Sequence, residues 1–375
     1  MNTVTIDEFE RDKRDKLIID LRSVEKYERG SIEGSIHIYW EDLDKHLPDL
    51  PKDKPIYLIC NTGVKSLEVA KELSEKGFDA YSIAYGYNAY LRAKAQKHCE
   101  VTAKDVERSI VKRFRKEIWR PFVKAINEYH MIQDGDRIAV CISGGKDSML
   151  MAKLFQELER HGKKNFECEY LVMNPGYNEI NYQTIVHNAE LLNVPIKVFE
   201  SDIFDTVAGD DIGGSPCYLC ARMRRGFLYA HAKELGCNKI ALGHHFDDVI
   251  ETIVMGMLYG AQIQTMMPKL HSTNFEGMEL IRPMYLIRED DIKRFRDYNN
   301  LYFIRCACRF TEKNESEGEG NQTSKRKEVK ELIAGLAGRD PVIEKNIFRS
   351  VENVNINTVI AYKDENGKHH FLDDY

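Results

Sequence analysis

The sequence predicts a chain of two α/β domains, each built on a largely parallel sheet. Three observations lead to this fold class. With 375 residues, the chain is too long for a single ordinary core. Short apolar runs alternate with helical patterns, which is typical of parallel strands joined by crossover helices. A long helical stretch rich in Lys and Arg interrupts the alternation and predicts a connector between two domains.

Composition indicates a globular protein in a reducing compartment. Hydrophobic residues make up 43% of the chain and charged residues 30%. No run approaches the 18 or so apolar residues of a membrane span, and the acidic, polar N-terminus does not resemble a signal peptide. The nine cysteines are odd in number and scattered, which argues against a disulfide framework. We therefore expect a cytoplasmic protein with reduced thiols.

The first domain is expected over residues 1–98, followed by a basic helical connector over 99–130. Apolar residues share one face of a helix over 66–77. In the connector, apolar side chains recur at a spacing of four, as one apolar face requires, at Ile110, Phe114, Ile118 and Phe122. Strands of the first domain are expected at 17–21, 56–59 and 80–84.

The second domain is expected over residues 131–355, and a tail over 356–375 contains a hairpin signal around Asp364 to Gly367. Residues 311–328 lack apolar anchors and are expected to form a mobile loop. Strands are expected at 137–142, 170–173, 196–199, 239–242 and 280–284. Helices are expected around 148–160, 180–192, 221–235, 247–258 and 289–298. Ligands of such sheets bind at the carboxyl ends of the strands.

A glycine turn follows the strand expected at 137–142 and leads into a helix. Its sequence over 143–148 is Ser-Gly-Gly-Lys-Asp-Ser. Gly144 and Gly145 let backbone N–H groups converge, and the dipole of the following helix favours an anion there. A polar turn that only caps the helix is the alternative. The segment is not a P-loop, which has four residues between its glycines.

Side chains of this turn suit a bound nucleotide phosphate. Lys146 adds a positive charge, and Ser143 and Ser148 add hydroxyl donors. Asp147 suits this place only if a Mg²⁺ ion lies between it and the phosphates, so we expect Mg²⁺. The segment resembles the SGGxDS loop of the ATP pyrophosphatases. That resemblance implies a doubly wound, mostly parallel sheet of the adenine nucleotide alpha hydrolase-like kind, and cleavage of ATP between its α and β phosphates.

Four cysteines of the second domain are candidate metal ligands. Cys217 and Cys220 have the spacing at which two thiolates can hold one metal ion or one edge of a cluster. From these residues alone, zinc, a redox disulfide and an iron–sulfur cluster all stay open. Cys306 and Cys308 follow much later in the chain, after the strand and helix over 280–296.

The surrounding segments resemble the tRNA 2-thiocytidine synthetases over about residues 105–355. The motifs that carry the resemblance are Pro216-Cys217 to Gly226, Lys239 to His245 with Asp247-Asp248, Arg282-Pro283-Met284, and Gly135-Asp136-Arg137. The resemblance implies a 4Fe–4S cluster on Cys217, Cys220 and Cys306. Cys308 is the alternative third ligand, because the chain has Cys-Ala-Cys where the family commonly has two residues between the late cysteines.

The resemblance also implies that Gly243, His244 and Asp247 line the ATP and Mg²⁺ pocket. The alternative for this strand end is an independent metal site, since several ligand-type side chains lie close together in the sequence. They are His244, His245, Asp247, Asp248 and Glu251.

Cys60 follows an apolar strand and precedes a tight loop and a helix, so backbone amides and the helix dipole converge on its sulfur. Together with Asp20-Leu21-Arg22 and Gly30 to Ile36, it resembles a single rhodanese domain, which implies a persulfide carried on Cys60. Lys65 stands where the family has arginine, and Tyr85 where it has glycine. Lysine keeps the charge but not the planar fork. A rhodanese that only binds partners is the alternative.

Together these resemblances imply an ATP-dependent tRNA sulfurtransferase. ATP would adenylate the oxygen on carbon 2 of a tRNA cytidine with the help of Lys146 and Asp147, and sulfide from the cluster would displace AMP. A persulfide on Cys60, loaded by a donor such as a cysteine desulfurase, would resupply the sulfur. The base and the donor are not identified by the sequence, and a homodimer is compatible with it.

Contacts with RNA are expected to come from local patches, because the net charge of −6 does not indicate a nucleic-acid binder. Basic residues with interleaved aromatic rings suit phosphates and exposed bases, although a solvated amphipathic helix looks the same. Two other function classes stay open: a sulfurtransferase that adenylates a small molecule, and a redox or sulfur-sensing module. The basic residues are Lys112, Arg113, Arg115, Lys116 and Arg120 around Phe114 and Trp119, and Arg222, Arg224 and Arg225.

Overall fold

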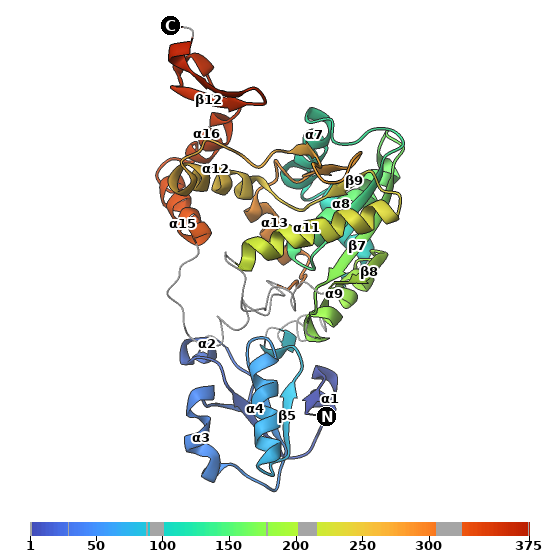
Figure 1. Ribbon diagram of the computed structural model, residues 1–375. Helices are drawn as coiled ribbons and strands as arrows, with labels where there is room; N and C mark the ends of the chain where they lie inside the picture. Colours follow the sequence, from blue (N-terminus) through green and yellow to red (C-terminus); the bar gives the residue numbers. More distant parts are fainter. Residues whose placement is uncertain are drawn as a thin grey trace. The chain divides into compact units, whose positions relative to one another are not determined.

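The computed structural model describes residues 2–28, 30–87, 89–90, 101–177, 179–201, 216–304, 325–373 and 375, with the backbone alone for 179–180 and 216–222. Contacts between Cα atoms divide the chain into two compact units (Figure 1). No helix within the described ranges is both long and apolar enough to cross a membrane. The first unit comprises residues 1–106, 177–193 and 296–317, and the second comprises 107–176, 194–295 and 318–375.

The first unit contains a five-stranded sheet in the order β1-β5-β4-β2-β3, with every pair parallel. The strands predicted from the sequence are therefore present. The strands are β1 (Thr3–Val4), β2 (Leu17–Asp20), β3 (Ser35–His37), β4 (Ile56–Ile59) and β5 (Ala80–Ile83). The helices around them are α1 (Ile6–Arg11), α2 (Val24–Glu28), α3 (Leu43–His46) and α4 (Val64–Glu75), with 3-10 turns at Trp40–Asp42 and Leu47–Asp49.

Strand β4 lies at the centre of this sheet. All four of its residues are buried, because helices cover both faces of a parallel sheet and leave no solvated side. This explains the continuous apolar run Ile-Tyr-Leu-Ile in place of an alternating pattern. Cys60 follows directly at the carboxyl end of β4, and α4 begins four residues later at Val64. The sheet therefore fixes the position of the Cys60 loop.

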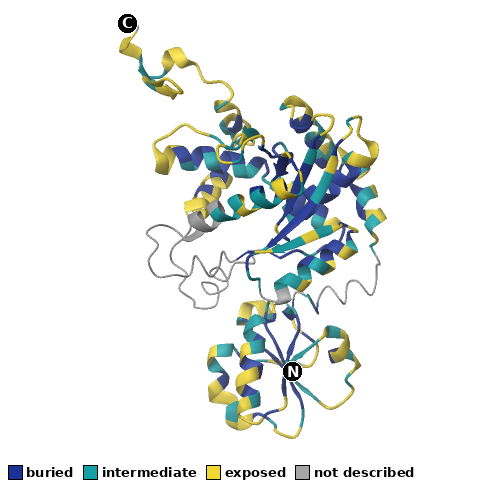
Figure 2. Cartoon of the chain, turned by 45° about the vertical axis from the view of Figure 1, so that its right-hand side comes forward, coloured by how far each residue is buried: buried dark blue, intermediate teal, exposed yellow. Residues whose placement is uncertain are grey.

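The second unit contains a six-stranded sheet in the order β10-β11-β9-β6-β7-β8. All pairs are parallel except β10 with β11. Figure 2 shows buried strands and exposed outer helix faces. The strands are β6 (Arg137–Ile142), β7 (Glu167–Asn174), β8 (Ile196–Glu200), β9 (Lys239–Ala241), β10 (Lys269–His271) and β11 (Glu279–Ile281). The helices after β6 are α8 (Lys146–His161), α9 (Glu179–Leu191), α11 (Pro216–Glu234), α12 (Phe246–Gly260), α13 (Glu289–Tyr298), α15 (Lys325–Ala337) and α16 (Ile343–Ser350).

Several bounds differ from the predicted ones. Strand β10, an antiparallel edge strand, was not expected. Strand β11 ends at Ile281 and does not continue to residue 284, since Pro283 has no N–H to donate to a ladder. Helix α11 begins at Pro216, which suits a first helical position, and not near 221. The tail does form the expected hairpin, from β12 (Ala361–Asp364) and β13 (Gly367–His370), flanked by 3-10 turns at Ile356–Thr358 and Phe371–Asp373.

The basic connector is not one continuous α-helix, as the apolar spacing had suggested. It consists of α6 (Ala103–Val111), a π-helical turn at Arg115–Trp119 and α7 (Arg120–Glu128). A spacing of four drifts by about 40° per step around an α-helix, so four such side chains would leave a common face. The wider π turn offsets this drift. All four apolar side chains, at Ile110, Phe114, Ile118 and Phe122, are buried.

Candidate active site

The glycine turn lies at the carboxyl end of β6, between β9 and β7 in the sheet, and α8 begins within it at Lys146. Gly144 has a left-handed backbone with φ of 82°. The Ser148 hydroxyl accepts a hydrogen bond from the Ser143 nitrogen at 3.1 Å and donates to the Gly145 carbonyl at 3.1 Å. Ser148 therefore fixes the turn, and the N–H groups of the first turn of α8, which have no partner within the helix, are suited to an anion.

Two charged side chains lie at the start of α8. The ammonium group of Lys146 is 3.0 Å from Asp147 Oδ2 and 3.1 Å from Glu289 Oε1. The other oxygen of Asp147, Oδ1, is buried and accepts no hydrogen bond from any described residue. His245 Nε2 lies 3.8 Å from this oxygen. A buried carboxylate oxygen without a partner is costly, and it is a suitable ligand for a hard cation.

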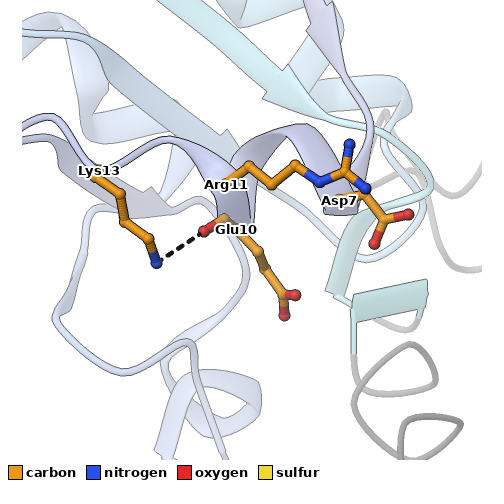
Figure 3. Close-up of a pocket in the computed structure, with 4 residues that line it drawn as sticks. All are labelled: Asp7, Glu10, Arg11 and Lys13. Carbon is orange, nitrogen blue, oxygen red and sulfur yellow. Dashed lines mark hydrogen bonds between the residues drawn. The ribbon is translucent and has the colours of Figure 1, made fainter.

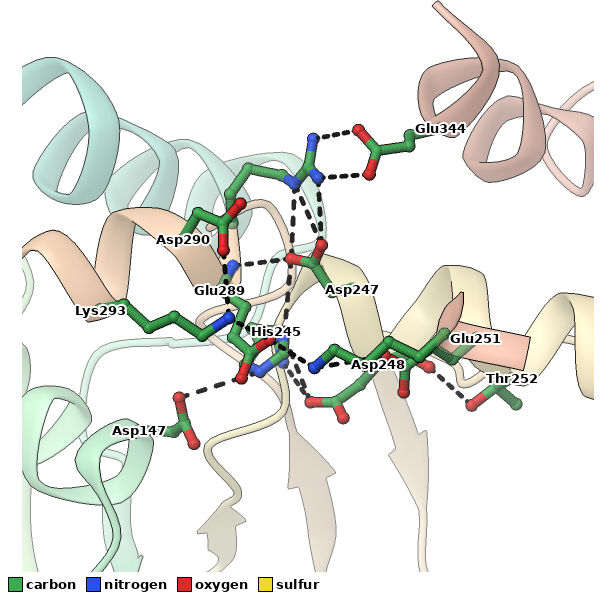
Figure 4. A network of polar contacts seen from close by, with 12 residues as sticks. Asp147, His245, Asp247, Asp248, Glu251, Thr252, Glu289, Asp290, Lys293 and Glu344 are labelled. Carbon is green, nitrogen blue, oxygen red and sulfur yellow. Dashed lines mark hydrogen bonds and ion pairs between the residues drawn. The ribbon is translucent and has the colours of Figure 1, made fainter. Parts of the chain in front are cut away.

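The strand-end residues predicted for the nucleotide pocket meet the glycine turn. Strands β9 and β6 are neighbours, so their carboxyl ends lie at one edge of the sheet. A Cβ atom on Gly243 would lie 3.3 Å from the backbone of Asp147 and Ser148, so the two segments are in close contact. His244 Nδ1 is buried without a hydrogen-bond partner among the described residues. Asp247 lies in the first turn of α12 (Figure 4).

The four cysteines predicted as cluster ligands are described only in part. Cys217 and Cys220 are the second and fifth residues of α11, and residues three apart share one face of a helix. Their side chains, and all of Cys306 and Cys308, lie outside the described part of the chain. Within the described ranges, no group of three or more His, Cys, Asp or Glu side chains could hold a metal ion.

The Cys60 sulfur lies in a loop of backbone amides in the first unit. It accepts hydrogen bonds from the nitrogens of Gly63 at 3.1 Å and Ser66 at 3.4 Å. Lys65, which replaces the usual arginine, pairs with Glu68 at 3.0 Å and lies 4.2 Å from the Trp40 ring. Glu68 and the Trp40 ring therefore hold the Lys65 ammonium.

Tyr85 replaces a family glycine but keeps the backbone conformation that glycine favours, with φ of 64°. Gly86 follows with φ of 67°, and a Cβ atom there would lie 2.4 Å from the Cys60 carbonyl oxygen. The Cys60 loop is thus packed directly against this turn.

An open hollow of about 640 Å³ lies elsewhere in the first unit (Figure 3). It is lined by Asp7, Glu10, Arg11 and Lys13, at α1 and just after it. None of the predicted site residues lines it, and its four lining residues carry two charges of each sign. The hollow therefore has no part in the candidate chemistry.

Comparison with known proteins agrees with this geometry. The PP-loop domain family matches residues 114–308, more than half of the chain, and the rhodanese-like domain family matches residues 5–93. The chain belongs to the PP-loop family. The tRNA-cytidine(32) 2-sulfurtransferase of Vibrio cholerae serotype O1 is 37% identical over 249 residues, which are 64% of this PP-loop chain and 75% of that protein.

Two further comparisons extend this result. The tRNA-cytidine(32) 2-sulfurtransferase of Coxiella burnetii is 34% identical over 65% of this chain and 91% of its own length. The structure of the U34-tRNA thiolase NcsA from Methanococcus maripaludis with its 4Fe–4S cluster has a TM-score of 0.51 and 23% identity, over 66% of this chain and 82% of that chain. It shows a shared fold. The predicted family resemblances and fold class are thus confirmed.

Electrostatics in the PP-loop site keep the Glu289 carboxylate ionised and the His244 imidazole neutral. Burial opposes ionisation of Glu289, but Lys330, Lys293 and Lys146 overcome this and hold its pKa well below the usual range. Burial, with the charge of Arg282 added, lowers the pKa of His244 to about 4. At neutral pH the His244 imidazole is therefore neutral, and it can donate or accept one hydrogen bond to a ligand.

Sequence reasoning missed the residues that connect the PP-loop site to the C-terminal helices. Arg326 on α15 donates to Glu251 at 2.8 Å and to Asp248 at 3.1 Å. Lys330 lies 2.6 Å from Glu289. Arg326 falls in the stretch 311–328 that was expected to be a loop, whereas α15 begins at Lys325. Nothing in the spacing of Arg326 and Lys330 identifies partners about 40 to 80 positions away.

The basic stretch offers fewer RNA contacts than its sequence suggested. Its five basic side chains are exposed. Phe114, however, is buried against Phe295, with ring centroids 5.6 Å apart, and cannot stack on a base. Trp119 is half-buried and stacks on Phe122 at 6.1 Å. Phosphate contacts remain compatible with this surface.

Proposed function

We propose that the chain is an ATP-dependent tRNA sulfurtransferase that converts a cytidine of tRNA to 2-thiocytidine. The observation that carries the proposal is the meeting of the PP-loop turn over 143–148 with Gly243 and His244 at one edge of the sheet. This arrangement offers backbone amides, one ammonium and a neutral imidazole to a nucleotide. Two relatives that span this region carry the name tRNA-cytidine(32) 2-sulfurtransferase.

The proposed chemistry has two displacement steps. In the first, the oxygen on carbon 2 of the base attacks the α-phosphorus of ATP, and the bond to the β-phosphate breaks to release pyrophosphate. The amides at the start of α8 and the Lys146 ammonium would stabilise the charge that develops on the leaving diphosphate. In the second, a sulfur nucleophile attacks carbon 2, and AMP leaves with the original oxygen. Exclusion of water from the site would protect the adenylated base from hydrolysis.

A Mg²⁺ ion would complete the site. The unpartnered Oδ1 of Asp147 fits this role, because a divalent cation would satisfy a buried oxygen that otherwise lacks a partner. The ion would also offset the repulsion between this carboxylate and the phosphates. Asp247 is less available, since Arg288 and the nitrogen of Glu289 already contact its two oxygens.

The cysteines fit an iron–sulfur cluster by donor chemistry. Cys217 and Cys220 lie three residues apart near the start of α11, and a third thiolate would come from Cys306 or Cys308. When bound, such a cluster would supply an iron on which sulfide can be held. In the sequence, Arg224 and Arg225 follow the cysteine pair and would add positive charge beside the ligands.

Cys60 would carry the sulfur as a persulfide. Its thiolate would attack the outer sulfur of a donor persulfide, such as that of a cysteine desulfurase, and the donor thiolate would leave. The amides of Gly63 and Ser66 would stabilise the resulting persulfide anion. A dithiol reductant would then release the outer sulfur as sulfide, with the dithiol oxidised to a disulfide and the Cys60 thiol restored. We expect this reaction to occur in the cytoplasm, either in a single chain or in a homodimer.

The proposal is tested by ATP turnover with purified, cluster-loaded protein. Wild type should release AMP only when unmodified tRNA is present. Ser148→Ala and Lys146→Ala should lower this rate by about 100-fold or more, as for other preorganised donors to a developing charge. Lys124→Ala, which removes an exposed lysine on α7, serves as the control and should change the rate little. ATP consumption without tRNA would instead favour a small-molecule acceptor, and full in vivo function without Lys146 and Ser148 would favour a sensing module.

A further inference from the structure

Glu289 lies at the centre of a cluster of lysines beside the PP-loop turn. It is the first residue of α13, and its side chain is 13% exposed. Its Oε1 contacts the Lys146 ammonium at 3.1 Å. Its Oε2 contacts Lys330 at 2.6 Å and Lys293 at 3.0 Å. One carboxylate therefore compensates three ammonium groups that come from three different helices.

The backbone of Glu289 is held as firmly as its side chain. Its nitrogen donates to Asp247 Oδ2 at 2.7 Å, which anchors the start of α13 to the start of α12 (Figure 4). Negative charge at the N-terminus of a helix is favourable, so Asp247 stabilises this end of α13. Glu289 thus lies between Asp247, which was predicted to line the nucleotide pocket, and Lys146 of the PP-loop turn.

The two oxygens of Glu289 have different partners. The lysine of the turn contacts Oε1, whereas the two lysines of α13 and α15 contact Oε2. If Lys146 turned toward a diphosphate, Glu289 would keep two positive partners and would not become an uncompensated buried charge. A diphosphate carries more charge than a carboxylate, so it can compete for the Lys146 ammonium at small cost to the protein.

We propose that Glu289 is a positioning residue that holds Lys146 beside the PP-loop turn and exchanges it with the β,γ-diphosphate. The inference rests on the proposed ATP chemistry. In the ATP-bound state Lys146 contacts the diphosphate, and Glu289 stays on Lys293 and Lys330. When pyrophosphate leaves, Glu289 takes Lys146 back. By competing for the same ammonium, Glu289 weakens the binding of pyrophosphate and speeds its release.

The proposal predicts that two variants change the affinity for pyrophosphate in opposite directions. Glu289→Gln keeps the shape but removes the competing charge, so pyrophosphate should bind about threefold to tenfold more tightly, in the range of a partly buried ion pair. The kcat of AMP release and the KM for ATP should both fall, because product leaves more slowly. Lys330→Gln leaves Glu289 with fewer partners and a stronger hold on Lys146, so pyrophosphate should bind more weakly.

The test is calorimetric titration of the full chain with inorganic pyrophosphate and Mg²⁺. Asp290→Asn is the matched control, because it removes the same charge from the next residue of α13 but contacts Lys293 and not Lys146. The Kd of Asp290→Asn for pyrophosphate should differ from that of wild type by about twofold or less, since the Asp290 side chain is 79% exposed and solvent screens its charge. The double variant Glu289→Gln with Lys330→Gln should bind pyrophosphate as Glu289→Gln alone does.

Each outcome decides a separate question. Wild-type protein that binds pyrophosphate, together with equal Kd values for wild type and Glu289→Gln, overturns the exchange. Equal shifts for Glu289→Gln and Asp290→Asn also overturn it, because they would reflect net charge alone. If Glu289→Gln does not fold, Lys330→Gln decides the question. Tighter binding of pyrophosphate by Lys330→Gln than by wild type also overturns the exchange. Wild-type protein that neither binds pyrophosphate nor releases AMP contradicts the proposed function itself.

Discussion

Asp247 and Glu344 are joined through a single arginine, although almost a hundred residues separate them in the sequence. Arg288 Nη2 lies 3.1 Å from Asp247 Oδ1 and 2.6 Å from Glu344 Oε1. Asp247 belongs to the predicted nucleotide pocket, and Glu344 lies on α16 near the end of the chain. The C-terminal helices are therefore part of the structure that positions the PP-loop site (Figure 4).

The first prediction concerns this arginine. Arg288→Ala should lower the free energy of unfolding of the second unit by about 1–3 kcal/mol, because two partly buried carboxylates lose their shared partner. Urea unfolding followed by circular dichroism measures the change. Arg294→Ala on the same helix is the control, since its pair with Asp291 is largely exposed on the arginine side and should contribute about 1 kcal/mol or less. Equal effects of the two variants would contradict the account.

A second prediction follows from the lowered pKa of His244. Its folded pKa of about 4 lies below the usual 6.5, so the unfolded chain binds a proton that the folded chain does not. The free energy of unfolding should therefore fall as the pH decreases from 7 to 5, with about 2 kcal/mol of the loss due to this group. His244→Gln should remove that part of the slope, as seen in urea unfolding at several pH values. The exposed His161, changed to Gln, should leave the slope as it is.

A third prediction concerns the turn that packs on Cys60. Gly86→Ala should destabilise the first unit by about 2–4 kcal/mol, because the left-handed backbone is strained and the new Cβ would meet the Cys60 carbonyl oxygen. Gly77→Ala is the matched control, with φ of 84° but open space around the added atom. It should cost only about 1 kcal/mol. Thermal unfolding of both variants separates contact from backbone strain.

These positions show what the sequence could predict. The turn over 143–148 was predictable because two glycines follow an apolar run and precede a helical pattern, and no distant residue is needed to recognise this. Cys60 was predictable for the same reason, since strand, loop and helix are consecutive. The break in the connector was not predicted, because the spacing of four indicated one apolar face of a continuous helix, although the π turn that forms accommodates this spacing better.

Other parts of the site could not be predicted, because they depend on contacts between distant segments. Nothing near Glu289 in the sequence shows that Lys146 and Lys330 lie on either side of its carboxylate. Arg326 looked like one charge in a polar run, yet it contacts Glu251 and Asp248. Such ion pairs leave no periodic signal, since they require only that two helix ends meet in the fold.

A fourth prediction concerns sulfur supply. Cys60→Ser should abolish thiolation driven by a persulfide donor but retain it when sulfide is added directly, because only the carrier step needs the Cys60 sulfur. Thiolated nucleosides measured by mass spectrometry after each reaction give the comparison. Cys168→Ser is the control, because burial raises the pKa of the Cys168 thiol far above its usual range and leaves it unreactive. Full thiolation by Cys60→Ser with the persulfide donor would show that the first unit is not a sulfur carrier.

The proposed tRNA thiolation can be tested by mass spectrometry of tRNA nucleosides from cells that lack this chain and are complemented with either wild type or Cys217→Ala. We expect that 2-thiocytidine disappears in the deletion strain, returns with wild type and stays absent with Cys217→Ala. Unchanged 2-thiocytidine in the deletion strain would contradict the account. The same spectrum would then show whether another thiolated base is lost, or whether the substrate is not tRNA.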